Sequence, residues 1–445
     1  MRKHWTFLFL GLLAIGCSGG DSGSSGGGIT SETPVVLKGD LEVQAFEGGY
    51  GIDFYQQSAK EFAELHPDLK IKVEGGPRVW EQLRPRFVAG NPPDLAFPGW
   101  GMDHWALVED GQLEPLDEAL KGKSFDGDTT WGEAFDPQML KLGQSEGKQY
   151  MLPYYVMMYG WWYNPKVFED NGWVPPTTYD ELLALCEKIK AKGIAPLTFQ
   201  GQYPYYMTTM MLFPWAQSAG GIEAVKAAQN LEPGAWKSPA FLKAAQMIDE
   251  LNKKGYFQKG AVAMNHTEAQ TQFLNGKAAM VMCGTWMESE MKSQTPPGVT
   301  FRFFMPPVLA DGPGDPTALV IGVEPWMVPV DSKNKEAAIG LFKYMTSRKE
   351  AKEFVEQKGT LMAIKGVEDA KIPPILEAPA AALKNAKTIY AMQYREWYPA
   401  FHKELENATT AMLNGELTPE QFCDRVEAAA EKTRKDPEVK KRKVA

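Results

Sequence analysis

Hydrophobic and polar positions change their period along the chain, and this change predicts an α/β fold. Residues 41–46, LEVQAF, alternate as a half-buried strand does, and the segment from Phe54 to Leu65 repeats its apolar side chains at helical spacing. LKIKVEG, which follows at 69–75, alternates as a second strand. A strand, a helix and a strand in this order form a βαβ unit, so the first third of the chain predicts parallel strands.

The middle of the chain is richer in helical patterns, and strands return near residues 300–330. Thr178 and Glu181 form a capping box, which starts a helix that ends at Gly193. A chain that leaves one set of strands and later returns to it predicts two lobes with a hinge between them. We expect an N-terminal lobe from residues 38–156 and 306–351, and a C-terminal lobe from residues 157–305 and 352–445.

Residues 147–164, GKQYMLPYYVMMYGWWYN, are rich in aromatic side chains and are interrupted by Pro153 and Gly160. This pattern predicts a strand, a crossover and a second strand rather than a helix. Two interpretations stay open for the rings. Most of them suit a buried core, whereas a ring facing a cleft offers a flat surface for stacking on a sugar, and the candidates are Tyr154, Tyr155 and Tyr159.

Composition excludes several kinds of chemistry. The chain has 445 residues, more than one ordinary core, and its net charge of −9 without a long basic stripe argues against nucleic acid. The short basic run KKRKVA at the end is expected to be a solvated tail. The five histidines form no metal-ligand pair, and neither a calcium loop nor a phosphate-binding loop occurs, so no metal and no cofactor is predicted. A carboxylate pair of a glycoside hydrolase stays open, because any two Glu residues can meet in a fold.

The N-terminus has the pattern of an export signal. Arg2 and Lys3 precede an apolar run that ends at Gly16 and is too short to span a bilayer. The sequence Ala14-Ile15-Gly16-Cys17 resembles a bacterial lipobox, in which the signal is cut before a cysteine that carries lipid. We therefore expect a signal peptide at residues 1–16 and, at residues 17–37, a lipidated Cys17 followed by a flexible Gly/Ser tether. We expect Cys186, Cys283 and Cys423 to be free thiols in the core, and one disulfide between two of them is the alternative.

Several segments, taken in their order and spacing, resemble one family. They are GNPPDLAF, GKQYMLPYYVMMYGWWYN, PTTYDELLALCEKIKAKGIAPLTF, FLNGKAAMVMCGTW, VEPWMVPVDSKNKEAAIGLFKYM and LNGELTPEQF. Behind a lipobox and a tether, they resemble the extracellular solute-binding proteins of carbohydrate ABC transporters, the class of maltose-binding protein. EGGYGIDFYQQSAKEF, LRPRFVAGNPPDL and FQGQYPYYM look most like receptors for N-acetylglucosamine and diacetylchitobiose.

This resemblance implies a two-lobed periplasmic-binding-protein (Venus flytrap) fold with hinge crossovers. Such a protein captures a mono- or oligosaccharide between its lobes and delivers it to the transmembrane subunits of an ABC permease. It implies a monomer without catalytic activity, held by the lipid on Cys17 at the periplasmic or extracellular face of the bacterial cell envelope. The alternatives are an exported glycoside hydrolase and a surface adhesin without a small ligand, and maltodextrins or plant-derived oligosaccharides are alternative ligands.

The resemblance also implies ligand contacts. Glu47 is the strongest polar candidate, because a carboxylate accepts hydrogen bonds from two sugar hydroxyls. Met157 stands where the family has a contacting Glu, which makes an apolar niche suited to an N-acetyl methyl group. A surface salt bridge is the alternative role of Arg78, and a core position is the alternative for Trp286, Trp326 and Trp397. The full predicted set is Glu47, Tyr50, Arg78, Trp100, Tyr154, Met157, Tyr203, Tyr205, Trp286, Glu324, Trp326, Arg395, Trp397 and His402.

Overall fold

The computed structural model describes residues 36–444. The predicted signal peptide, Cys17 and most of the tether lie outside these residues. The strands are β1 (Gly39–Phe46), β2 (Leu69–Gly76), β3 (Leu95–Phe97), β4 (Gln144–Ser145), β5 (Lys148–Gln149), β6 (Met151–Tyr163), β7 (Ala195–Thr198), β8 (Ala278–Gly284), β9 (Arg302–Phe304), β10 (Leu319–Met327), β11 (Leu361–Met362) and β12 (Ile389–Tyr390).

The helices lie between these strands and after the last of them. They are α1 (Asp53–Leu65), α2 (Val79–Val88), α3 (His104–Glu109), α4 (Asp117–Lys121), α5 (Pro137–Leu140), α6 (Pro165–Asn171), α7 (Tyr179–Ala191), α8 (Tyr205–Met207), α9 (Phe213–Gln229), α10 (Pro239–Lys253), α11 (His266–Leu274), α12 (Met287–Met291), α13 (Lys335–Met345), α14 (Arg348–Lys358), α15 (Glu377–Asn385), α16 (Tyr394–Trp397), α17 (Pro399–Leu413) and α18 (Pro419–Lys435). The predicted capping box of Thr178 and Glu181 is present at the start of α7.

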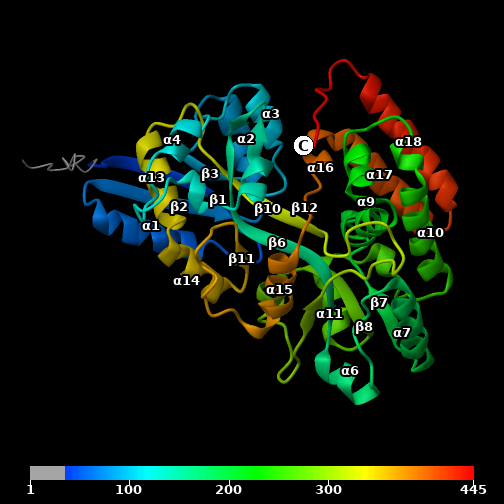
Figure 1. Ribbon diagram of the computed structural model, residues 1–445. Helices are drawn as coiled ribbons and strands as arrows, with labels where there is room; N and C mark the ends of the chain where they lie inside the picture. Colours follow the sequence, from blue (N-terminus) through cyan, green and yellow to red (C-terminus); the bar gives the residue numbers. More distant parts are fainter. Residues whose placement is uncertain (1–35, 445) are drawn as a thin grey trace, which may run out of the picture. The chain divides into compact units, whose positions relative to one another are not determined.

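A mixed sheet of ten strands connects the described part of the chain (Figure 1). Its main path runs in the order β2-β1-β3-β10-β6-β8-β7, and β9, β11 and β12 pair beside that path. The pairs β1–β2, β1–β3 and β7–β8 are parallel, whereas β6 is antiparallel to both β10 and β8. Helices α1 and α13 pack beside β1 and its neighbours, and α7 and α11 pack beside β7 and β8. The predicted α/β class is confirmed.

The aromatic stretch forms one continuous strand, β6, rather than two strands with a crossover. Its first half pairs with β10 and its second half with β8 and β9. Pro153 fits because it faces Pro325 where the register of β6 and β10 shifts, so neither proline removes a needed ladder hydrogen bond. Gly160 fits because a Cβ there would lie 2.3 Å from the Phe303 ring on β9. The two residues expected to break the strand therefore let its neighbours approach.

Two large hydrophobic cores lie along β6. The first core contains Leu152, Tyr154 and Tyr155, and the second contains Val156, Met158, Trp161 and Trp162. A smaller third core lies under α2 and α3, around Trp80 and Trp105. A single strand thus passes from one core to the next within two residues.

We expected the chain to change lobes at residues 306 and 352, but the chain changes from one core to the other at different residues. Val320 and Ile321 on β10 belong to the second core, whereas Trp326 on the same strand belongs to the first. Phe354 and Val355 on α14 also pack in the first core, because α14 lies against α1. We propose that the crossings between lobes lie inside β6, inside β10 and after α14.

The structure also bears on the three cysteines and on the basic C-terminal tail. Cys186, Cys283 and Cys423 are buried free thiols, in agreement with the core interpretation. The basic tail is not simply solvated: the Arg442 guanidinium lies 4.9 Å from the centre of the Trp105 ring and pairs with Glu109. Within residues 36–444, no helix combines the length and apolar character needed to cross a membrane.

Candidate functional site

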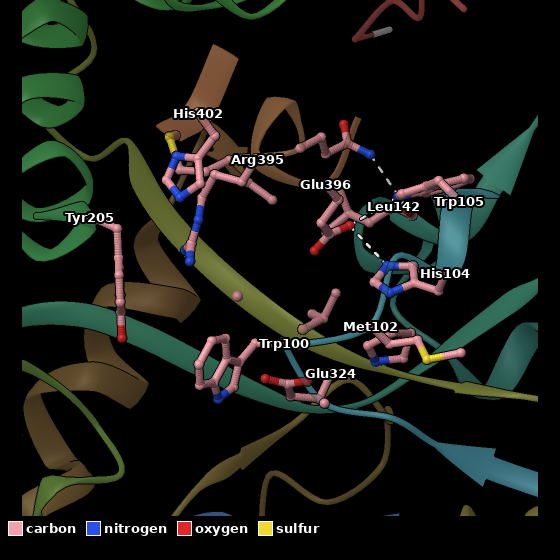
Figure 2. A pocket seen from close by; sticks show the side chains of 18 of the residues that line it. Trp100, Met102, His104, Trp105, Leu142, Tyr205, Glu324, Arg395, Glu396 and His402 are labelled. Carbon is pink, nitrogen blue, oxygen red and sulfur yellow. Dashed lines mark hydrogen bonds and ion pairs between the residues drawn. The ribbon is translucent and has the colours of Figure 1, made fainter. Parts of the chain in front are cut away.

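A cavity of about 630 Å³ opens where β6 and β10 pass between the cores (Figure 2). Its floor includes Met157 and Tyr159 on β6 and the segment 321–325 of β10. Its sides come from the loop before α3, from the loop before α8, and from α16 with the first turns of α17. Residues that are far apart in sequence, and that belong to all three cores or pack against them, therefore share one space.

Aromatic rings form one part of the lining, which we call the aromatic wall: Trp100, Tyr203 and Tyr205. Trp100 is 61% exposed, and its ring lies 4.9 Å from that of Trp80, which fixes its position. Tyr203 stacks on the His266 ring at 3.8 Å. The aromatic wall thus offers flat faces that the third core and α11 hold in place.

Charged groups form another part, which we call the charged wall: His104, Glu324, Arg395 and Glu396. Glu396 Oε2 lies 2.9 Å from His104 Nε2 and accepts a hydrogen bond of 2.9 Å from Trp105 Nε1. The Arg395 guanidinium lies 4.3 Å from the centre of the Tyr205 ring, so a cation–π contact joins the two walls. Figure 2 shows Glu396 turned towards His104, while Arg395 extends towards Tyr205.

The surroundings of these groups shift their pKa values. Burial alone lowers the pKa of His104, but the carboxylate of Glu396 outweighs it, so the pKa of His104 is raised and the pair favours its ionised form. Burial also opposes ionisation of Glu396, yet His104, Trp105 and Arg395 together lower the pKa of this carboxyl. Glu324 has no such partners, and burial followed by the nearby charge of Glu396 raises its pKa to about 7. Two carboxyl groups in one cavity therefore favour opposite protonation states.

Other polar groups at the same end of the cavity are held neutral. Burial, followed by the charges of Arg395 and Lys403, lowers the pKa of His402 to about 3. Burial raises the pKa of Tyr159 to about 12 even though Arg395 opposes this shift. Both side chains are therefore neutral hydrogen-bonding groups at ordinary pH.

Part of the predicted site set lines this cavity, and the cavity brings these residues together from five segments of the chain. They are Trp100, Met157, Tyr203, Tyr205, Glu324, Arg395 and His402. Tyr159, one of the three rings for which a cleft position was left open, also lines it. Their role as ligand contacts stays a prediction.

The structure places the other predicted residues outside the cavity. Tyr154 and Trp326 are enclosed in the first core, where Trp326 stacks on Phe97 at 5.2 Å, so the core alternative holds for both. Tyr50 is buried edge-on against Tyr155 at 4.9 Å, because the loop after β1 folds back on β6.

Four further members of the set have surface or packing positions instead. Glu47 is exposed in the loop after β1, and Arg78 pairs with Glu81 at the surface, as its alternative supposed. Trp286 is half-buried, packed edge-on against Tyr159 at 5.7 Å. Trp397 packs against the second and third cores and does not line the cavity.

Sequence reasoning missed His104, Trp105 and Glu396. Glu396 lies between two predicted residues, Arg395 and Trp397, so its position in the sequence could have indicated a place in the site. His104 and Trp105 follow Trp100 closely, but nothing in the sequence indicates that α3 meets α16. That contact joins residues 292 positions apart.

The chain belongs to the family of bacterial extracellular solute-binding proteins, whose model matches residues 48–352. It is similar to the diacetylchitobiose binding protein NgcE of Streptomyces coelicolor, with 29% identity over 98% of this chain and 95% of the relative. It is also similar to the multiple sugar-binding protein of Streptococcus mutans, with 23% identity over 82% of this chain and 88% of the relative.

Solved structures share the fold. A chitin oligosaccharide binding protein has a TM-score of 0.73 and 22% identity, over 89% of this chain and 98% of its own. RafE in complex with raffinose has a TM-score of 0.70 and 20% identity, over 89% of this chain and 99% of its own. The two-lobed solute-binding fold predicted from the resemblance is confirmed.

Proposed function

We propose that this protein is the substrate-binding lipoprotein of an ABC importer, which captures a mono- or oligosaccharide in the cavity and delivers it to the permease. One observation supports this above all: the aromatic wall and the charged wall face the same space. A pyranose has flat C–H faces for the first and a rim of hydroxyls for the second. Closure of the lobes over the sugar would add contacts that exist only in the closed form, which is what drives such a motion.

The ligand we propose is N-acetylglucosamine or its β-1,4-linked dimer. Met157 lines the cavity next to Tyr159 on β6, which gives the floor an apolar patch. An acetyl methyl gains from burial there, whereas a bare hydroxyl leaves its hydrogen bonds unmade. The name of the relative from Streptomyces coelicolor points to the same class of sugar.

Isothermal titration calorimetry of the purified protein against a sugar panel tests this function. Diacetylchitobiose and cellobiose are the matched pair, because they share the β-1,4 linkage and differ in the acetamido groups. We expect N-acetylglucosamine or diacetylchitobiose to bind and cellobiose to bind much more weakly. Equal binding of both dimers would refute the acetyl niche, and no binding of any sugar would refute the capture function.

A glycoside hydrolase remains the second candidate because of one observation. The pKa of Glu324 is raised to about 7 while that of Glu396 is lowered, which is the pattern of an acid and a base in hydrolases. In this structure, however, Glu396 is engaged by His104 and Trp105. Product analysis of the calorimetry samples separates the two functions, since any cleaved glycoside would favour the hydrolase.

The proposed anchor is tested separately from the cavity. We propose that the mature chain begins at lipidated Cys17 and stays at the membrane as a monomer beside its permease. Cys17→Ser should release the protein from the membrane fraction without changing its sugar affinity. A wild-type chain found in the soluble fraction with a free N-terminus elsewhere would refute the anchor.

A further inference from the structure

Glu324 occupies an irregular position in the centre of the sheet. The register between β6 and β10 shifts between Val323 and Pro325. There Glu324 alone stands opposite Tyr154 and Tyr155, so the extra residue of this bulge is on β6, beside the Pro325–Pro153 pair. A bulge bends the paired strands and increases their local twist, and the Glu324 side chain opposite it points into the cavity (Figure 2). The irregular pairing of β6 with β10 therefore places this carboxyl at the cavity.

Most of the Glu324 residue is buried, its carboxyl opens to the cavity, and no protein group donates a hydrogen bond to it. The residue is 8% exposed, and the groups that influence its ionisation act only through burial and through charge, not through a hydrogen bond. A carboxyl that is largely removed from water and has no protein donor depends on the contents of the cavity for its hydrogen bonds. Its neighbour Glu396 shows the contrast, because two donors satisfy it.

Every element packed around Glu324 supplies groups that bear on its charge. Glu396 on α16 opposes its ionisation, whereas Arg395 on α16 and His104 on α3 favour it. The tyrosines that face it, Tyr55 on α1 with Tyr155 and Tyr159 on β6, are neutral because burial raises their pKa values. The other charged or titratable residues around the cavity are Arg84, Asp103, His402, Lys403 and Glu406. None of these groups donates a hydrogen bond to Glu324, so a donor has to come from the contents of the cavity.

We infer that Glu324 is the specificity-determining acceptor of the cavity, which takes hydrogen bonds from two adjacent donors of the bound sugar and so couples sugar capture to the release of a proton. This inference rests on the proposed function. An ionised carboxylate accepts at both oxygens, whereas the protonated form keeps one oxygen as a donor. Adjacent hydroxyls, or a hydroxyl beside an amide N–H, match the ionised form, so they favour loss of the proton on binding.

The coupling has a measurable consequence. With a pKa of about 7, Glu324 is about half protonated at neutral pH before the sugar arrives. Binding should then release about half a proton at that pH. One pH unit below the pKa, only about one tenth of the molecules hold the binding-competent carboxylate, so the affinity should fall by up to about tenfold.

Calorimetry of the full chain in buffers that differ in ionisation enthalpy measures both effects. Diacetylchitobiose is the probe, at one pH unit below and one above the pKa of Glu324 and at that pKa. Glu324→Gln keeps the shape and removes the titration. Glu118→Gln is the matched control, because the Glu118 side chain is 86% exposed on α4 and lies outside the cavity.

We expect wild type and Glu118→Gln to release a proton and to bind more tightly as pH rises. Glu324→Gln should bind about tenfold to a hundredfold more weakly above the pKa, with no pH dependence from this group and no proton release. Thermal melting checks that the variant is folded. Proton uptake, or an unchanged affinity and pH profile in Glu324→Gln, would overturn the inference while leaving sugar capture intact. Failure of wild type to bind any sugar at any pH would overturn both.

Discussion

The aromatic wall and the charged wall of the cavity are built in different ways. Trp100 is exposed and rests on one neighbouring ring, whereas Glu396 is held by donors from α3, and Glu324 stands opposite a bulge in β6, beside the paired Pro153 and Pro325. A ring needs only a support behind it to offer its face, so aromatic contacts form from short local segments. A buried charge needs partners in defined directions, and these come from distant parts of the chain. The first wall supplies contact area, and the second supplies orientation.

A substitution in the core below both walls should cost more stability than any substitution in the walls themselves. Trp326 is fully buried in the first core, among Tyr55, Phe97 and Phe342. Trp326→Ala should lower the free energy of unfolding by about 3–5 kcal/mol, because it leaves a large cavity. Chemical denaturation measures this loss. A small loss of stability combined with a large loss of sugar affinity would instead make Trp326 part of a binding wall.

The charged wall should make stability depend on pH. The pKa of Glu324 is raised from 4.5 to about 7, so the folded state holds this proton more tightly than the unfolded state. The stabilisation that this proton gives to the folded state is complete below pH 4.5, the pKa of the unfolded state. It is lost as pH rises through 7, which lowers the free energy of unfolding by about 3 kcal/mol in total.

Glu324→Gln should remove that loss, so the variant should be more stable than wild type above pH 7 in denaturation experiments without ligand. The raised pKa of His104 acts with the same sign and persists in the variant, because Glu396 is its main charged partner and Glu324 is the last of the charges that raise it, so the difference between the two curves reports mainly on Glu324. An identical pH dependence in the two proteins would show that Glu324 is not desolvated.

The aromatic wall should affect binding without affecting the fold. Trp100→Ala removes an exposed ring, so it should weaken sugar binding by about 1–3 kcal/mol through lost stacking and lost buried area. The melting temperature should change little, in contrast with Trp326→Ala. Calorimetry and a thermal melt of the same sample test both halves of this prediction, and unchanged affinity would remove Trp100 from the wall.

The outer support of the charged wall should have the smallest effect. The Arg442 guanidinium lies over Trp105, whose indole N–H donates to Glu396, and it pairs with Glu109. Arg442→Ala should cost about 1 kcal/mol of stability through the lost cation–π contact and ion pair. Lys443→Ala, beside it in the tail, is the control. Equal melting curves for wild type and Arg442→Ala would return the tail to the solvated role predicted from its charge.

The sequence by itself determined the class of fold, the capping box of α7, the family and much of the aromatic wall. Period and capping are local properties, and Trp100, Tyr203 and Tyr205 stand in short motifs that the family resemblance covers. Tertiary structure decided which aromatic residues are core: Tyr154 and Trp326 have the same composition signal as Trp100, and only the packing of α1, α13 and α14 encloses them. It also decided the charged wall, because a hydrogen bond between His104 and Glu396 depends on two lobes meeting, which no local pattern encodes. The bulge opposite Glu324 is an intermediate case, since Pro153 and Pro325 are visible in the sequence, but that they face each other is known only once β6 and β10 are paired.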